Sequence, residues 1–137
     1  MLLLGPDGQI LLQRRSQSKR VYPDLWTSSA SGHVSAGQTP LEAAAREVEE
    51  ELGCRAQALE QVDVHRFQDP DVGENERVHV FLAGATGRLD PDAREVSATR
   101  WIQPEDLDAW LQRSPDAFAP SFPPVWAGAQ AHVLGKP

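Results

Sequence analysis

The sequence lacks the features that mark several large classes of protein. Its 137 residues contain a single cysteine, Cys54, which excludes an intramolecular disulfide framework and makes a cytoplasmic location the expectation. No apolar run approaches the roughly 20 residues that a transmembrane helix needs. The apolar start at residues 1–4 breaks at Gly5 and Pro6, so it is too short for the core of a signal peptide.

Positive charge is also scarce. The chain has 13 Lys and Arg residues against 20 Asp and Glu, and its net charge is −7. This balance argues against a general nucleic-acid-binding surface, because phosphate backbones are bound by basic patches. The length suits one domain over residues 1–137. We therefore expect a small-molecule ligand and no nucleic acid or membrane, while a homodimer stays open.

Acidic residues are concentrated in one segment, residues 32–54, which reads GHVSAGQTPLEAAAREVEEELGC. On a helix, Glu47, Glu50 and Glu51 fall within an arc of roughly 100°. Three carboxylates this close repel each other, unless a hard cation such as Mg²⁺, which takes oxygen ligands and is often shared with substrate phosphates, lies among them. A glutamate-rich helix face is also commonly just solvated. The neighbouring residues therefore have to decide between the two interpretations.

Those neighbours predict an amphipathic helix with capping residues at both ends. Thr39 suits the N-cap, Pro40 the first helical position and Gly53 the C-terminal cap. The helix should pack on a core and present its acids outward, and Gly32 and Gly37 bracket a loop whose backbone can approach a ligand. The predicted core stripe consists of Leu41, Ala45, Val48 and Leu52, with Ala44 at its edge. Cys54 is expected to be a buried small hydrophobe.

Periodicity and turn residues predict the other elements. Strands are expected at 1–4, 9–14, 26–30, 55–67, 77–83 and 98–102, and helices at 40–53, 104–111 and 125–134. Within 55–67, Val62, Val64 and Phe67 are the candidate inward positions. Strands on both sides of a central helix, with further helices at the C-terminal end, predict an α+β domain.

The acidic segment resembles the Nudix box, whose pattern is Gly, five residues, Glu, seven residues, then Arg-Glu-apolar-x-Glu-Glu-x-Gly-apolar. The matching positions are Gly32, Arg46, Glu47, Val48, Glu50, Glu51, Gly53 and Cys54. Gln38 replaces the first Glu, which in the family usually supports the box arginine; Gln can hydrogen-bond but brings no charge. The resemblance implies a Nudix-type α/β/α sandwich with a mixed, curved β-sheet.

The same resemblance implies roles for the box residues. Glu47 and Glu51 would ligate Mg²⁺ or Mn²⁺, and Glu50 would be a further ligand or the base for an attacking water. Gly32 would offer its carbonyl oxygen to the metal. Arg46 would form hydrogen bonds within the box loop.

Residues outside the box are expected to complete the site. A further acid is needed, either Glu95 in a catalytic role or Glu76 on the substrate side, and the sequence does not choose between them. Arg15 and Lys19 could contact substrate phosphates, Arg through a forked contact and Lys as a point charge. His33 is expected to be a polar loop residue.

Fragments over roughly residues 8–110 are similar to isopentenyl-diphosphate isomerase, a Nudix-fold relative. They are Arg14-Arg15, Ser18-Lys19, Trp26-Thr27, Gly32-His33, Glu74-Asn75-Glu76 and the stretch 95–101. Ser31, however, stands where that isomerase has its catalytic Cys, and a serine hydroxyl is a poor proton donor or acceptor near pH 7 without an adjacent base. The isomerase also uses histidines upstream of residue 8, absent from this sequence, and has lost most of the box carboxylates.

Three hypotheses follow. The first is metal-dependent hydrolysis of a nucleoside-diphosphate-linked or related diphosphate, with the metal stabilising charge and activating water. The second is isomerisation of an allylic diphosphate. The third is a domain that binds a phosphorylated ligand without turning it over, for which Gln38 would be an early sign.

Overall fold

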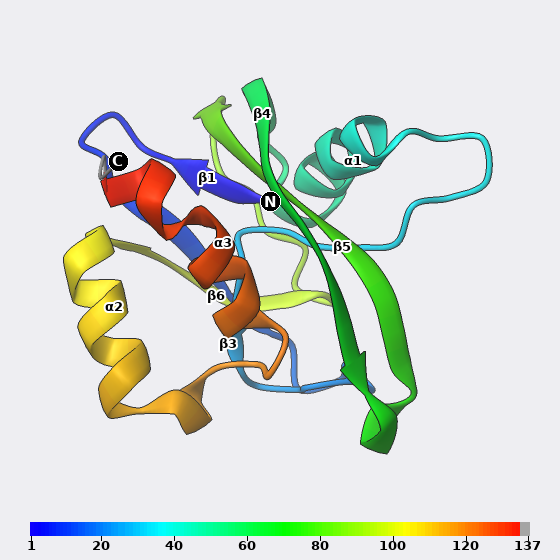
Figure 1. The fold of residues 1–137 in the computed structure, drawn as a ribbon. Coiled ribbons are helices and arrows are strands. Elements are labelled where there is room, and N and C mark those ends of the chain that lie inside the picture. The colour runs from blue at the N-terminus through cyan, green and yellow to red at the C-terminus, as the bar shows by residue number, and fades with distance from the viewer. Residues whose placement is uncertain (135–137) are drawn as a thin grey trace.

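The computed structural model describes residues 1–134 as a six-stranded sheet with helices on both faces (Figure 1). The strand order is β3-β2-β1-β5-β4, and β6 pairs with β2. The strands are β1 (Leu2–Leu4), β2 (Ile10–Arg15), β3 (Trp26–Thr27), β4 (Arg55–Asp69), β5 (Glu74–Thr86) and β6 (Val96–Ile102). The helices are α1 (Pro40–Leu52), α2 (Pro104–Arg113) and α3 (Phe122–Leu134), with short 3₁₀ turns η1 (Pro70–Val72) and η2 (Pro115–Ala117).

The sheet is mixed, because β1 runs parallel to β5 while the other pairs are antiparallel. Alternating side chains of the strands divide the core into two apolar clusters, one on each face. Leu2 and Leu12 pack in the cluster that contains residues of α2 and α3, and their neighbours Leu3 and Leu11 pack in the cluster under α1. The predicted α+β sandwich is confirmed. No helix in the described part of the chain is both long and apolar enough to cross a bilayer.

The β4–β5 hairpin leaves one strand edge uncovered, and this positions the site. β1 pairs with β5 only at residues 82–84, so in residues 74–81 the described partner of β5 is β4 alone. Figure 1 shows the two strands continuing together past the rest of the sheet. Side chains on both faces of β5 can therefore line a cavity beside this uncovered edge.

Helix α1 has the predicted ends. Thr39 and Glu42 form a reciprocal capping box, with the Glu42 backbone N–H donating to Thr39 Oγ1 at 3.1 Å, and Gly53 ends the helix at φ 71°. Its core face, however, differs from the predicted stripe. Leu41 is 47% exposed, whereas Glu51 is buried at 7% exposure. The expectation that the helix presents its acids outward is therefore wrong for Glu51. This residue lies on the buried face of α1, where Gln13 of β2 bonds its carboxylate.

Three further differences from the predicted elements lie in strands β3 and β4 and at the start of helix α3. The strand expected at 26–30 is regular only at Trp26–Thr27, because Ser29 then bonds through its hydroxyl to the backbone of β1 and β2. Val64 is 42% exposed instead of inward, since the β4–β5 register shifts between Gln61 and Asp63. Helix α3 begins three residues earlier than expected, at Phe122, because prolines are tolerated in a first helical turn.

Candidate active site

A cavity of about 570 Å³ opens beside the uncovered edge of β5. Its walls come from the loop before α1, from α1 itself, from the loop after β2 and from β5. Five residues singled out by the sequence lie in these walls: Arg15, Lys19, Gly32, Glu47 and Glu76. Arg77 and Glu74 also line the cavity, which therefore combines three cations with three carboxylates, as a site for a metal-bound anion requires.

The most buried acid next to the cavity is Glu51, which bonds Glu47 but does not itself line the cavity. Gln13 of β2 donates from Nε2 to Glu51 Oε1 at 2.7 Å and to the Ser29 carbonyl at 2.7 Å. Burial, followed by a hydrogen bond with Glu47, raises the pKa of Glu51 to about 8, although the Gln13 bond opposes the shift. In the metal-free protein near neutral pH, the Glu51 carboxyl therefore holds its proton.

Arg46 links the box loop to the helix. Its guanidinium donates to Glu47 Oε1 at 2.7 Å, to Gln38 Oε1 at 2.7 Å, to Ser35 Oγ at 3.0 Å and to the His33 carbonyl at 3.2 Å. The expected role of Arg46 within the box loop agrees with these contacts. Gln38 thus makes the arginine contact expected of the glutamate that it replaces, without a negative charge.

Gly32 lies directly against the Glu47 carboxylate. A Cβ added at residue 32 would come within 2.2 Å of Glu47 Cδ, so the close approach requires glycine. Carboxylate oxygens are the donors that hard divalent cations prefer. The chemistry of Glu47 and Glu51 therefore suits a Mg²⁺ or Mn²⁺ ion, and the role of the Gly32 carbonyl stays a prediction.

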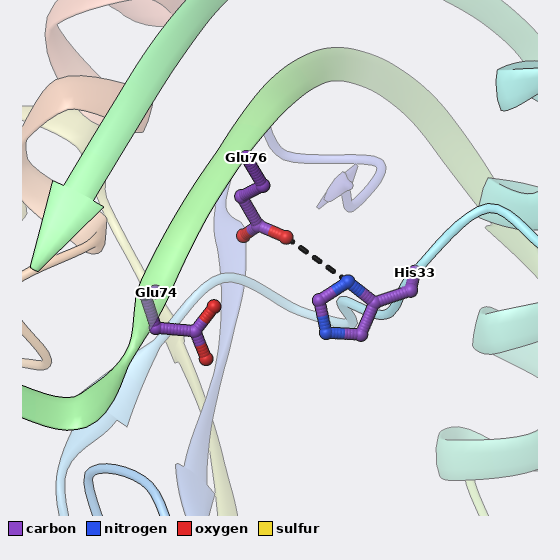
Figure 2. Close-up of side chains that lie close together, drawn as sticks. All are labelled: His33, Glu74 and Glu76. Atoms are coloured by element: carbon purple, nitrogen blue, oxygen red, sulfur yellow. Dashed lines mark ion pairs between the residues drawn. The ribbon is translucent and has the colours of Figure 1, made fainter.

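A second acidic group lies on β5 opposite the same loop (Figure 2). His33, Glu74 and Glu76 each offer a ligand atom, and these atoms lie within 4.8 Å of one another. His33 Nδ1 is 3.1 Å from Glu76 Oε2. Burial raises the pKa of the Glu76 carboxyl, and His33 opposes the shift. His33, expected to be an ordinary loop residue, thus belongs to a potential metal-binding group.

Of the remaining candidates, Arg15 and Lys19 line the cavity, whereas Glu50 and Glu95 do not. Lys19 forms an ion pair with Glu95, and Lys19 lines the cavity whereas Glu95 does not. Burial lowers the pKa of Arg15, whose Nε donates to the Val21 carbonyl at 2.9 Å. The Glu50 side chain is 59% exposed and lies 3.5 Å from Arg46 Nε, outside the cavity walls. Glu76 thus lines the same cavity as Glu47, whereas Glu95 meets the cavity only through its ion pair with Lys19.

Sequence reasoning missed three contributors. Glu74 stands in the same fragment as Glu76, so the spacing of two on a strand could have indicated it. Gln13 carried a weaker signal as an uncharged polar residue in an apolar strand. Tyr22 donates through its hydroxyl to Asp69 Oδ2 at 2.6 Å and ties the loop after β2 to the tip of the hairpin; burial and this bond raise its pKa.

The family model described as the NUDIX domain matches residues 1–122. The chain belongs to the Nudix family. Among curated proteins, it is 37% identical to an isopentenyl-diphosphate Delta-isomerase of Paenarthrobacter aurescens, over 94% of this chain and 79% of that one. It is 38% identical to a protein of the same name from Salmonella heidelberg, over 86% of this chain and 67% of that one.

Solved Nudix structures have the same fold. A NUDIX hydrolase from Nitrosomonas europaea matches 98% of this chain and 86% of its own, with a TM-score of 0.74 at 18% identity. A MutT NUDIX hydrolase from Burkholderia pseudomallei matches 75% of this chain and 79% of its own, with a TM-score of 0.67 at 26% identity. The Nudix chain thus resembles proteins named as isomerases in sequence and proteins named as hydrolases in structure.

Proposed function

We propose that this Nudix protein hydrolyses a diphosphate compound with a divalent cation held by Glu47, Glu51 and the Gly32 carbonyl. The observation that carries the proposal is the contact between Glu47 and the buried Glu51: burial and the hydrogen bond with Glu47 raise the pKa of Glu51 to about 8, next to a cavity lined by Arg15 and Lys19. When bound, the cation would neutralise phosphate charge and lower the pKa of an attacking water.

The residues of the chain have separate roles in this reaction. Arg15 and Lys19 bind and orient the diphosphate oxygens. Water attacks one phosphorus, the bridging P–O bond breaks, and the products are two phosphorylated compounds or one compound and phosphate. Glu76 accepts the proton from water, since it lines the cavity and its burial raises the pKa of its carboxyl. Arg46 holds Glu47 in position.

The test is a panel of nucleoside- and sugar-linked diphosphates assayed for product release with Mg²⁺. We expect turnover of at least one compound, its abolition in Glu51→Gln, and full activity in the matched control Glu49→Gln on the exposed side of α1. Glu76→Gln should lose far more activity than Glu95→Gln. Full activity of Glu51→Gln on the best substrate would show that the assigned mechanism is wrong.

Isomerisation of isopentenyl diphosphate is the second candidate. The curated relatives carry that name, and the His33–Glu74–Glu76 group lies among the isomerase-like fragments. Ser31 at the position of the isomerase cysteine argues against it. NMR of the protein with isopentenyl diphosphate and Mg²⁺ distinguishes the two activities, because isomerisation moves the double bond whereas hydrolysis releases phosphate. We expect no isomer.

A non-catalytic binding domain is the remaining alternative. The hydrolase is favoured over it because Glu47 and Glu51 are both present, with Glu47 lining the cavity and Glu51 buried next to it. Tight binding of diphosphate compounds with no metal-dependent turnover of any of them would support the binding domain instead.

A further inference from the structure

The outer half of the β4–β5 hairpin, residues 66–76, carries two acids of the candidate site but has little packing of its own. These acids, Glu74 and Glu76, line the cavity. None of the residues in this hairpin arm is buried, and none belongs to either core cluster. Among residues 1–134, its two strands pair only with each other (Figure 1). A two-stranded hairpin is marginally stable by itself in water, so contacts with the rest of the protein must fix the position of its acids.

In the described part of the chain, two polar side-chain contacts join the hairpin arm to the rest of the protein. One is the contact of His33 Nδ1 with Glu76 Oε2 at 3.1 Å, but the His33 side chain is 77% exposed, and a pair so open to water contributes little. The other is the hydrogen bond that the Tyr22 hydroxyl donates to Asp69 Oδ2 at 2.6 Å. Both of its partners are half-buried, and a short bond to a carboxylate is among the strong ones. The Tyr22–Asp69 bond is therefore the main polar contact that holds the arm.

The loop after β2 holds Tyr22 in a backbone conformation that costs free energy. The φ of Tyr22 is 50°, in the left-handed region that a bulky residue rarely adopts, and Asp24 follows at φ 63°. Such strain persists only where surrounding contacts fix the backbone, and it concentrates at functional sites. Here the backbone is fixed on both sides of Tyr22, because Arg15 Nε donates to the Val21 carbonyl at 2.9 Å and Arg14 pairs with Asp24 at 2.7 Å. The loop thus presents the phenol to the hairpin arm from a fixed base.

We propose that Tyr22 and Asp69 are positioning residues, whose hydrogen bond holds the hairpin arm so that Glu76 stays in the cavity. The proposal rests on the proposed function, in which Glu76 accepts the proton from the attacking water. Asp69 lies directly opposite Glu74 in the β4–β5 ladder, and the next pair on the same face is Phe67 with Glu76, so fixing Asp69 fixes both acids. The cations Arg15 and Lys19 have contacts of their own outside the arm. Loss of the bond should therefore impair proton transfer more than binding of the diphosphate.

Hydrogen exchange read by mass spectrometry, on the full chain without metal or substrate, tests whether the bond holds the arm. We expect the ladder amides of residues 66–76 to exchange about tenfold faster in Tyr22→Phe, as the loss of a charge-assisted bond predicts. Asp69→Ala should have at least the same effect, and adding it to Tyr22→Phe should give less than the sum of the two. Asp69→Asn keeps an oxygen that accepts from the phenol, so its exchange should stay within about threefold of the unmodified protein.

The control is Asp24→Asn, which breaks the ion pair with Arg14 in the same loop but leaves the Tyr22–Asp69 bond in place. Asn tolerates the left-handed φ at this position, so exchange of residues 66–76 should stay unchanged. Unchanged exchange of the arm in Tyr22→Phe, or equal acceleration in Asp24→Asn, would overturn the role of the bond whatever the activity of the variants.

Steady-state kinetics with Mg²⁺, on the best substrate of the diphosphate panel, tests the consequence for the reaction. In Tyr22→Phe we expect kcat to fall about tenfold because Glu76 is misplaced, while KM changes by less than about threefold. Asp69→Asn and Asp24→Asn should keep most of kcat. Faster exchange with unchanged kcat would overturn the positioning role and leave the hydrolase proposal standing. No turnover of any compound would overturn the proposed function and the positioning role together, even where exchange shows that the bond holds the arm.

Discussion

Replacing Glu51 by Gln should stabilise the metal-free protein while it removes the activity. Glu51 is 7% exposed, and its pKa is raised from an ordinary 4.5 to about 8. A raised carboxyl pKa means that the folded state binds more protons than the unfolded state between these two values. Stability contributed by the neutral carboxyl is therefore lost as the pH rises through this window. Gln does not titrate, so the variant should not show this loss.

The size of the effect follows from the two pKa values. With 4.5 in the unfolded chain and about 8 in the folded chain, ionisation of this one group lowers the free energy of unfolding by roughly 4 kcal/mol between pH 5 and pH 9. The side chain is almost fully buried, so solvent screening removes little of it. A difference of this order corresponds to a shift in melting temperature of roughly 10 °C for a domain of this size.

Thermal unfolding in EDTA from pH 5 to pH 9 measures the effect. The melting temperature of Glu51→Gln minus that of the unmodified protein should grow with pH, whereas Glu49→Gln, on the exposed side of the same helix, should show a constant difference. Mg²⁺ should raise the melting temperature of the unmodified protein at pH 8 and leave that of Glu51→Gln unchanged. A pH-independent difference for Glu51→Gln would refute the raised pKa of the buried Glu51 carboxyl.

Three further substitutions test the packing around the site. Gly32→Ala would place a Cβ 2.2 Å from Glu47 Cδ, so kcat/KM in the Mg²⁺ assay should fall by about tenfold or more because the carboxylate must move. Thr39→Ala removes the capping box of α1 and should cost about 1 kcal/mol in denaturant unfolding, with activity per folded molecule unchanged. Gly128→Ala in α3 would place a Cβ 2.3 Å from Asp63 Oδ2. The clash should lower the free energy of unfolding by about 1–3 kcal/mol and outweigh the gain in helix propensity. A variant that is more stable than the unmodified protein would contradict this prediction.

The box helix could be predicted from sequence because its signals are local. The cap at Thr39, the proline after it and Gly53 at the other end act within a turn or two, and all three have the predicted positions. The burial of Glu51 could not be predicted in this way. Its partner Gln13 lies 38 positions earlier in the chain, and only the docking of α1 on β2 makes the pair.

The choice between the acids outside the box also could not be predicted from the sequence. Sequence reasoning left Glu76 and Glu95 as equal candidates, because each stands in or beside a strand with a similar family match. The choice depends on which strand faces the loop before α1, and the uncovered edge of β5 places Glu76 there, 3.1 Å from His33. Glu95 instead pairs with Lys19. Strand pairing between distant segments sets such contacts, and side-chain periodicity carries no information about it.

Substitutions of Gln38 test whether the box requires a negative charge or only a hydrogen-bond acceptor at its first acidic position. Its Oε1 accepts from Arg46 Nη1 at 2.7 Å and from the Ser35 backbone N–H at 3.2 Å, and a carboxylate could accept both bonds. Gln38→Ala removes both hydrogen bonds, so Arg46 should hold Glu47 less firmly. We therefore expect the Mg²⁺ concentration for half-maximal activity to rise and kcat/KM to fall about tenfold.

Gln38→Glu should change kcat/KM by less than about threefold, since a half-exposed charge next to Arg46 is partly screened by solvent. Titrating both variants with Mg²⁺ in the hydrolysis assay measures the two effects side by side. A gain of more than tenfold in Gln38→Glu would mean that the charge itself supports the metal site. Arg46 would then contact a third carboxylate besides those of Glu47 and Glu50, and the hydrogen-bonding role assigned to Gln38 would be wrong.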